Sequence, residues 1–491
     1  MRTYSKLVGY FTGISWMFSP YGVPFVMYNT GLVASILTLI FIAIASFIPV
    51  MWILETLCRA QALETMKERK ADVDMESVDL GSLTEIMSLC KIKTGRRFEL
   101  QELCEIFIGK PAAIICTLLV VVYLSNWTTV VISATALATN APVDSHGSFL
   151  TQCTDSDFHF RLHPDGTCWN TYTLSVLVFG VFSLIVAFTE LGEMRILQTV
   201  LAFVRFATIG AMIVYSIFTV DEDHSHDRKV HWFQFSLRGF LAAVPTLVYA
   251  HLTVIGIPTI SEPVARKQGL AKMWAGIFFT TSSFCGILGL TVAVRFKSTV
   301  NEVASLNWVP LTHSSNIVLR IFAYWIVLYP SVEQCVSYGM TSIILANTVE
   351  SLLVGSNKHS RVERSIHRFL WTAARLIAPI FVSNLVAESK YVSLVLFWLM
   401  YFIPGLLQFC SRNRWLAEIK KVTVAAPEII EHHNATERTG LISTKIRLNI
   451  VNDTPYSGWY SRPIVVVVVQ LFGLLAFGLT VVGLALPHSL S

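Results

Sequence analysis

The chain has 491 residues, of which 54% are hydrophobic and only 14% are charged, and its formal net charge is +5. Soluble domains carry about 25% charged residues, so this composition excludes a single water-soluble fold. The apolar residues come in blocks of about 20, which is the helix length that crosses about 30 Å of hydrocarbon. The blocks lack the alternating pattern of barrel strands. We therefore expect an all-α polytopic membrane protein.

The apolar blocks predict about eleven transmembrane helices, since each block is long enough to cross the bilayer once. The eighth block is too long for one upright helix and contains Pro330, a natural kink point. In chain order the predicted helices are residues 7–28, 31–54, 111–138, 171–191, 197–219, 236–258, 273–295, 316–346, 369–386, 391–410 and 463–486.

The orientation follows from the basic residues, because most of the 37 Lys and Arg fall in alternate loops. The positive-inside rule then places the N-terminus in the cytoplasm. The net charge reflects this bias, so the expected partner is a lipid bilayer and not a nucleic acid. The predicted regions are a cytoplasmic N-terminus (1–6), a transmembrane core (7–410) with a cytoplasmic loop (59–110) and an external loop (139–170), a cytoplasmic loop (411–462), and a last helix with an external C-terminus (463–491).

Three features of the loops bear on structure and partners. Cys153 and Cys168 lie in the external loop, where an oxidising compartment would allow a disulfide, the alternative being two free thiols. Residues 98–110 place apolar side chains at helical spacing and predict a short amphipathic helix at the cytoplasmic interface. The loops 59–110 and 411–462 are long enough to bind cytoplasmic partners.

Two predicted helices contain sequences that interrupt a regular helix. Residues 19–24 read Ser-Pro-Tyr-Gly-Val-Pro, and the sixth helix contains Gly256-Ile257-Pro258 after a polar run. Proline removes a backbone donor, and breaks in helices one and six are typical of a five-plus-five inverted repeat with substrate at the midplane. The alternative is a pair of ordinary kinks. The predicted substrate-binding residues are Ser19, Pro20, Tyr21, Gly22, Thr253, Gly256 and Ile257.

Charged and polar residues inside the blocks form a second group of candidates. Glu333 lies near the centre of the eighth predicted helix, and Ser337 follows one turn later. An acid there costs about 2.5 to 3.5 kcal/mol on insertion scales, so we expect it to couple transport to a proton or cation, or to form a structural ion pair. Arg205 could pair with Glu333, bind a substrate carboxylate or extend to the cytoplasmic face. Asn126 completes the predicted polar path, the alternative being a contact between helices. Two further arginines are expected to extend to the membrane surface: Arg320 and Arg375.

Enzyme chemistry is not expected. The sequence contains no phosphate-binding loop, no HExxH motif, no nucleophile elbow and no paired CxxC motif. His251 is a weak candidate for an intramembrane hydrolase, because a lone buried histidine is more often structural. We therefore expect no cofactor and no metal site, apart from a coupling ion, H⁺ or Na⁺.

Several motifs resemble one transporter family. They are Gly13-Ile-Ser15-Trp-Met-Phe-Ser-Pro20-Tyr21-Gly22, the helix at 98–110, Val204-Arg205-Phe206-Ala207, the stretch from Gly256 to Glu262, and Leu328-Tyr-Pro330. They are similar to the amino acid/auxin permease family of the amino acid-polyamine-cation superfamily, and to a divergent branch of it. The resemblance implies a broken-helix inverted repeat, sodium- or proton-coupled amino acid transport, and a plasma or lysosomal/vacuolar membrane.

Departures from that family pattern affect the coupling ion. Ser15 replaces the second glycine of the first motif, and Cys335 and Val336 replace the hydroxyls expected for sodium, so Glu333 favours proton coupling. The sequence thus predicts a secondary active transporter of amino acids or related small solutes. The alternative is a non-transporting amino acid sensor or membrane scaffold that retains the fold.

Overall fold

The computed structural model describes residues 3–17, 20–72, 92, 98–125, 167–188, 191–218, 232–353, 361–381, 394–424 and 454–485. Within these ranges the regular structure is helical, and the β-type pairing is one isolated bridge between Tyr4 and Val264. Six described helices are long and apolar enough to cross a membrane, which supports a helical, multi-pass membrane protein. They are Leu32–Glu68, Ile196–Phe218, Leu237–Ser261, Leu270–Thr299, Leu394–Ile419 and Pro463–Leu484.

The first predicted helix is divided into α1 (Lys6–Met17) and α2 (Val23–Thr30), and the sixth into α11 (Leu237–Ala250) and α12 (Ile257–Ser261). A short 3₁₀ turn, η2 (Val254–Gly256), leads into α12. In each break a proline, Pro24 or Pro258, occupies the first turn of the second half-helix. Proline is tolerated there because the first N–H groups have no partner within the helix. These prolines therefore begin helices and do not kink them.

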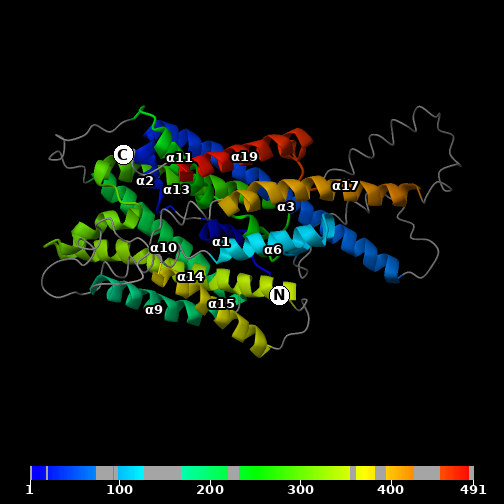
Figure 1. Ribbon diagram of the computed structural model, residues 1–491, viewed down its shortest axis with the longest axis horizontal. Coiled ribbons are helices and arrows are strands. Elements are labelled where there is room, and N and C mark those ends of the chain that lie inside the picture. The colour runs from blue at the N-terminus through cyan, green and yellow to red at the C-terminus, as the bar shows by residue number, and fades with distance from the viewer. Residues whose placement is uncertain are drawn as a thin grey trace.

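Helix α3 (Leu32–Asp72) has 41 residues and is much longer than the predicted helix at 31–54. At a rise of about 1.5 Å per residue it extends about 60 Å, roughly twice the hydrocarbon thickness. The range predicted as a loop from residue 59 therefore begins as helix. Helix α17 (Ile403–Val424), preceded by the π-helical turn η5 (Trp398–Phe402), likewise continues beyond the predicted end at 410. Both helices extend past the rest of the bundle at one end (Figure 1).

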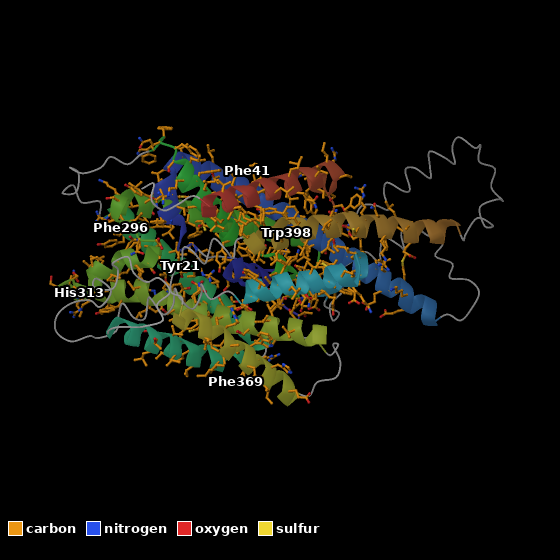
Figure 2. All side chains as sticks on the ribbon, in the orientation of Figure 1. Tyr21, Phe41, Phe296, His313, Phe369 and Trp398 are labelled. Atoms are coloured by element: carbon orange, nitrogen blue, oxygen red, sulfur yellow. The ribbon has the colours of Figure 1, made fainter. Side chains whose placement is uncertain are left out.

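In the view of Figure 1 the helices form an upper and a lower layer, with α1 between them. Helices α9 (Thr167–Ala187), α14 (Ile317–Leu353) and α15 (Arg361–Phe381) pack on one another and form the lower layer in this view. The upper layer holds α2, α3, α11, α17 and α19 (Pro463–Ala485). Helices α1 and α10 (Leu191–Phe218) pack on each other and on α13 (Leu270–Phe296). Tyr21 lies in the interior, whereas Phe41 and Phe369 lie on opposite outer faces (Figure 2).

The short helix predicted at 98–110 is present as α5 (Leu100–Phe107). Glu99 and Glu102 form a capping box at its start, and its apolar face is buried, with Leu103 fully covered. The helix packs on α6 (Lys110–Leu124), α17 and α3. A packed face explains why this amphipathic segment is ordered here. The remaining short elements are η3 (Lys297–Thr299), η4 (Ala304–His313) and η7 (Trp459–Ser461).

The segment between α12 and α13 is bound by two distant parts of the chain. The backbone N–H of Tyr4 donates to Pro263 (3.1 Å), and that of Ala265 donates to Tyr4 (3.0 Å). The hydroxyl of Tyr456 donates to the carbonyl oxygen of Lys267 at 3.4 Å. The Lys267 ammonium donates to the Ser261 carbonyl oxygen at 3.0 Å and also to that of Glu262. This lysine therefore neutralises the partial negative charge at the end of α12.

Lys267 makes the stability of the protein dependent on pH. Burial lowers the pKa of Lys267 to about 8, and the negative charge of Glu262 opposes that change. Between this value and the unfolded value of about 10.4, the unfolded state binds more protons, so stability rises with pH. We expect the unfolding temperature of the wild type to rise, relative to that of Lys267→Met, as the pH increases across this interval. Lys272→Met, which removes an exposed lysine of α13, is the control and should show the same rise as the wild type. Loss of the rise in Lys272→Met as well would contradict the assignment to Lys267.

Candidate functional site

The two helix breaks lie against each other in the middle of the bundle. Trp16, near the end of α1, packs directly on Gly256: a Cβ at Gly256 would lie 2.7 Å from the indole nitrogen. Gly22 similarly lies close to α11, since its Cβ would be 3.1 Å from a methyl carbon of Thr246. Glycine permits both close approaches because it has no side chain. The structure thus brings together the two segments that the sequence predicts as substrate-binding.

A buried ion pair lies beside these breaks. Arg205 of α10 bonds to Glu333 of α14, and their side chains are only 1% and 2% exposed. The hydroxyl of Tyr21, in the first break, donates to the second carboxylate oxygen of Glu333 at 2.8 Å. A charge pair removed from water is tolerated only when further hydrogen bonds satisfy both partners. The three side chains therefore connect α10, α14 and the break as one polar unit.

Arg205 has a second set of acceptors at the end of α1. Its guanidinium donates to the carbonyl oxygens of Ile14 (3.1 Å) and Ser15 (3.2 Å). The last carbonyls of a helix have no partner within it and carry partial negative charge. The guanidinium therefore occupies the position at which a broken helix can otherwise hold a cation.

Tyr21 also joins the ion pair to a segment outside the long helices. Its carbonyl oxygen accepts a hydrogen bond from the backbone N–H of Ala304 at 2.8 Å. Its ring is 4% exposed and packs in a small cluster with Val303 and Leu306, at and near the start of η4. A displacement of η4 would therefore move Tyr21 and change its hydrogen bond to Glu333.

The other predicted site residues have different outcomes. Thr253 is fully buried in the second break, and its hydroxyl has no hydrogen-bond partner among the described residues. Such an orphaned hydroxyl costs free energy unless something binds it. Ser337 is half-buried one turn beyond Glu333. Pro20, Gly256 and Ile257 are buried at the breaks, whereas Ser19, Asn126 and Cys153 lie outside the described residues. Cys168 lies in the first turn of α9, so the predicted external loop 139–170 ends before residue 167 and the predicted Cys153–Cys168 bridge is not tested.

His251 begins the second break and is completely buried. Its ring nitrogens contact the Leu247 carbonyl oxygen and the Ser282 hydroxyl, each at 2.8 Å. The ring of Phe278 stacks on it with centroids 6.1 Å apart. Because Nδ1 faces a carbonyl, it carries the proton, and Nε2 accepts from Ser282. The histidine thus holds the end of α11 against α13.

The expectation that Arg375 extends to the membrane surface is wrong. Its guanidinium is buried and donates to Thr341 at 3.0 Å and to Ser342 at 2.8 Å. It also lies over the ring of Tyr338, 4.1 Å from the centroid. The two hydroxyls accept hydrogen bonds from the guanidinium and the aromatic ring contacts its charge, so these groups replace the water that would solvate Arg375 at the membrane surface. Arg320, by contrast, is exposed as expected.

A second buried ion pair is missing from the sequence prediction. Arg59 bonds to Glu55 at 2.7 Å, and both are at most 1% exposed. Arg59 also donates to Gln408 (2.8 Å) and Ser411 (2.9 Å) of α17, and the Ser461 hydroxyl bonds to Glu55. The spacing of four residues between the two charges was the available signal. It was missed because the predicted helix ended at residue 54.

Comparison with known proteins gives distant relatives. No family model matches the sequence. The chain is 21% identical over 465 residues to a protein named "Transmembrane protein 104 homolog" from Drosophila melanogaster, covering 84% of this chain and 89% of the relative. It is 22% identical over 372 residues (74% and 73%) to a protein of the same name from Caenorhabditis elegans, and 23% identical over 351 residues (70% and 68%) to one from Caenorhabditis briggsae.

These relatives support a membrane protein that crosses the bilayer several times. The sequence motifs resemble a group of membrane proteins that includes transmembrane protein 104, and the relatives carry this name, so this part of the expectation is supported. The wider amino acid/auxin permease family is not supported by the comparisons and is carried only by the motifs.

Proposed function

We propose that the protein is a secondary active transporter of amino acids or related small solutes, with a cytoplasmic N-terminus and about eleven crossings arranged as a broken-helix inverted repeat. The observation that carries the proposal is the contact between the two breaks, Trp16 on Gly256, beside the Arg205–Glu333 pair. Paired discontinuous helices near the bilayer midplane are the usual construction of a binding site in such transporters. The membrane is proposed to be the plasma or lysosomal/vacuolar membrane.

The substrate is proposed to bind between the two breaks. Thr253 offers a buried hydroxyl without a described partner, and the ends of the half-helices offer peptide dipoles of both signs. A zwitterion matches such a site because its carboxylate suits the positive helix end and its amine the negative end. Gly22 and Gly256 let the two breaks lie close to their neighbours, Thr246 and Trp16. No enzyme chemistry and no cofactor are proposed.

The coupling ion is proposed to be a proton. The permanently charged guanidinium of Arg205 donates to the carbonyl oxygens of Ile14 and Ser15. It therefore takes the position at which Na⁺ would bind at that helix end. Glu333 is the group that can gain and lose a proton. When it is protonated, its attraction for Arg205 weakens, and α10 and α14 are then joined by the hydrogen bonds of Trp325 to Thr208 and of Tyr329 to Leu201. Binding of substrate and proton would then change the same contacts.

The test is uptake of radiolabelled amino acids by the reconstituted full chain. We expect a pH gradient to drive uptake and a sodium gradient to have no effect. Glu333→Gln keeps the size of the side chain but cannot exchange a proton, so gradient-driven accumulation should be lost while exchange of substrate across the membrane continues. Glu302→Gln, which removes an exposed acid, is the matched control. Unchanged accumulation in Glu333→Gln would remove the acid from coupling, and no uptake of any amino acid would contradict the substrate class.

A sensor or scaffold remains the second proposal, and the length of α3 and α17 favours it. Both helices continue past the bundle at the same end (Figure 1), and they lead into the loops predicted to bind partners. A sensor would bind an amino acid and change its partner contacts without moving the solute. Substrate counterflow in liposomes distinguishes the two, because a transporter exchanges labelled for unlabelled substrate and a sensor does not.

A further inference from the structure

A groove of about 890 Å³ runs between α3 and α13. Residues between Ile36 and Phe47 form one wall, residues between Ala275 and Leu290 form the other, and Trp459 completes the lining. The walls are apolar apart from two serine hydroxyls. From Ile36 to Phe47 the helix rises by 11 residues at about 1.5 Å each, so the groove extends about 16 Å along α3. This length is close to half of the ~30 Å hydrocarbon thickness.

The setting of the groove determines what fills it. Both α3 and α13 are among the helices able to cross a membrane. The side chains at its rim are exposed on the outer surface, by 51% for Ile40, 53% for Ile44 and 76% for Phe279. Phe41, on the same part of α3, lies on the outer face of the bundle (Figure 2). Apolar space of this kind does not hold water, so in the bilayer it faces hydrocarbon chains.

The inner wall of the groove is continuous with the second helix break. Phe278 and Ser282 both line the groove, and both contact His251, by ring stacking and by the 2.8 Å hydrogen bond. His251 in turn holds the Leu247 carbonyl oxygen at the end of α11. A molecule in the groove therefore touches the two side chains that position the residue at which the helix is interrupted.

We propose that the groove between α3 and α13 binds one acyl chain of a bilayer lipid and that the chain stabilises the break after α11 through Phe278 and Ser282. An acyl chain fits because it extends through about one leaflet, which is the length of the groove, and because it is apolar like the walls. It fixes the ring of Phe278 and the hydroxyl of Ser282 from the outside, and these fix His251. The proposal does not depend on transport, since none of its measurements uses uptake.

Occupancy can be measured on the purified full chain in lipid nanodiscs. The probe is a phosphatidylcholine that carries a photoreactive diazirine in one acyl chain. We expect crosslinked peptides to concentrate in 36–47 and 275–290, and to be lost there in Ala275→Phe, which fills the groove with a ring. Ala207→Phe, at an exposed alanine of α10, is the matched control and should keep them. Equal crosslinking density on α10 and α19, unchanged in Ala275→Phe, would show ordinary surrounding lipid only and overturn the site.

The connection to the break is tested by thermal unfolding in detergent with and without added phosphatidylcholine. Lipid should raise the midpoint of the wild type and of Ala207→Phe, leave Ala275→Phe unchanged, and raise Ser282→Ala by less than the wild type. Ala43→Leu, on the opposite wall, serves as the second filling variant should Ala275→Phe not fold, and it should also respond weakly. The same rise in every variant would overturn the connection.

Discussion

Arg205→Met is expected to destabilise the protein by about 3–5 kcal/mol, because it leaves the Glu333 carboxylate buried without its counter-ion. The carboxylate is 2% exposed, and the hydrogen bond from the Tyr21 hydroxyl would remain without a positive charge beside it. The measurement is the thermal unfolding midpoint of the purified protein in detergent. Removing both charges, in Arg205→Met/Glu333→Leu, should recover most of the loss, since an apolar pair of similar volume replaces a buried ion pair at little cost.

The control for this prediction is Arg320→Met on α14, which removes an exposed arginine and should change the midpoint little. A double variant no more stable than Arg205→Met would show that the carbonyl oxygens of Ile14 and Ser15, and not Glu333, account for the contribution of Arg205. Either result identifies which partner the guanidinium mainly serves.

The second large effect is expected at Gly239, where α11 begins. A Cβ there would lie 2.1 Å from the carbonyl oxygen of Asn29 and 2.4 Å from its carbonyl carbon, both backbone atoms at the end of α2. Backbone cannot rotate away as a side chain can, so the two half-helices must separate. Gly239→Ala should therefore cost at least about 1–3 kcal/mol, the usual cost of overpacking, with reduced folded yield.

Gly210→Ala is the matched control, since nothing lies within 4 Å of the added methyl group. Alanine in an open helical position should leave stability unchanged or raise it by up to about 1 kcal/mol. Fluorescence-detected size-exclusion chromatography and thermal unfolding measure both variants. Equal behaviour of the two would mean that α2 and α11 are not held at the close distance that the structure shows.

Local chemistry made the helix breaks predictable. Proline and glycine act on their own backbone, so the segments around Pro20 and Gly256 could be identified without knowledge of the fold. The contact of Trp16 with Gly256 could not, because it depends on how α1 and α12 pack. The place of Tyr21 in the first break could be predicted from its neighbours Pro20 and Gly22. Its hydrogen bond to Glu333 could not, because it joins residues 312 positions apart.

Burial of charge was the feature that sequence reasoning handled least well. Glu55, Arg59 and Arg375 resemble residues that flank a membrane helix, and the predicted helix ends were placed accordingly. In the structure each has polar partners from another helix, Gln408 or Ser342 among them, which offset the cost of leaving water. Such partners are distant in sequence, so a count of charges near a helix end cannot reveal them. Eleven crossings and the inverted repeat stay predictions, since six of the described helices are long and apolar enough to cross a membrane.

The length of α3 has a mechanical consequence. A single helix carries one wall of the groove near its start, the Glu55–Arg59 pair further along, and its last turn, ending at Asp72, beyond the bundle. Pro49 lies in α3 between the groove and the ion pair, and an interior proline removes one backbone hydrogen bond and favours a kink. A bend at Pro49 would change the angle between the part of α3 that lines the groove and the part that carries Glu55 and Arg59.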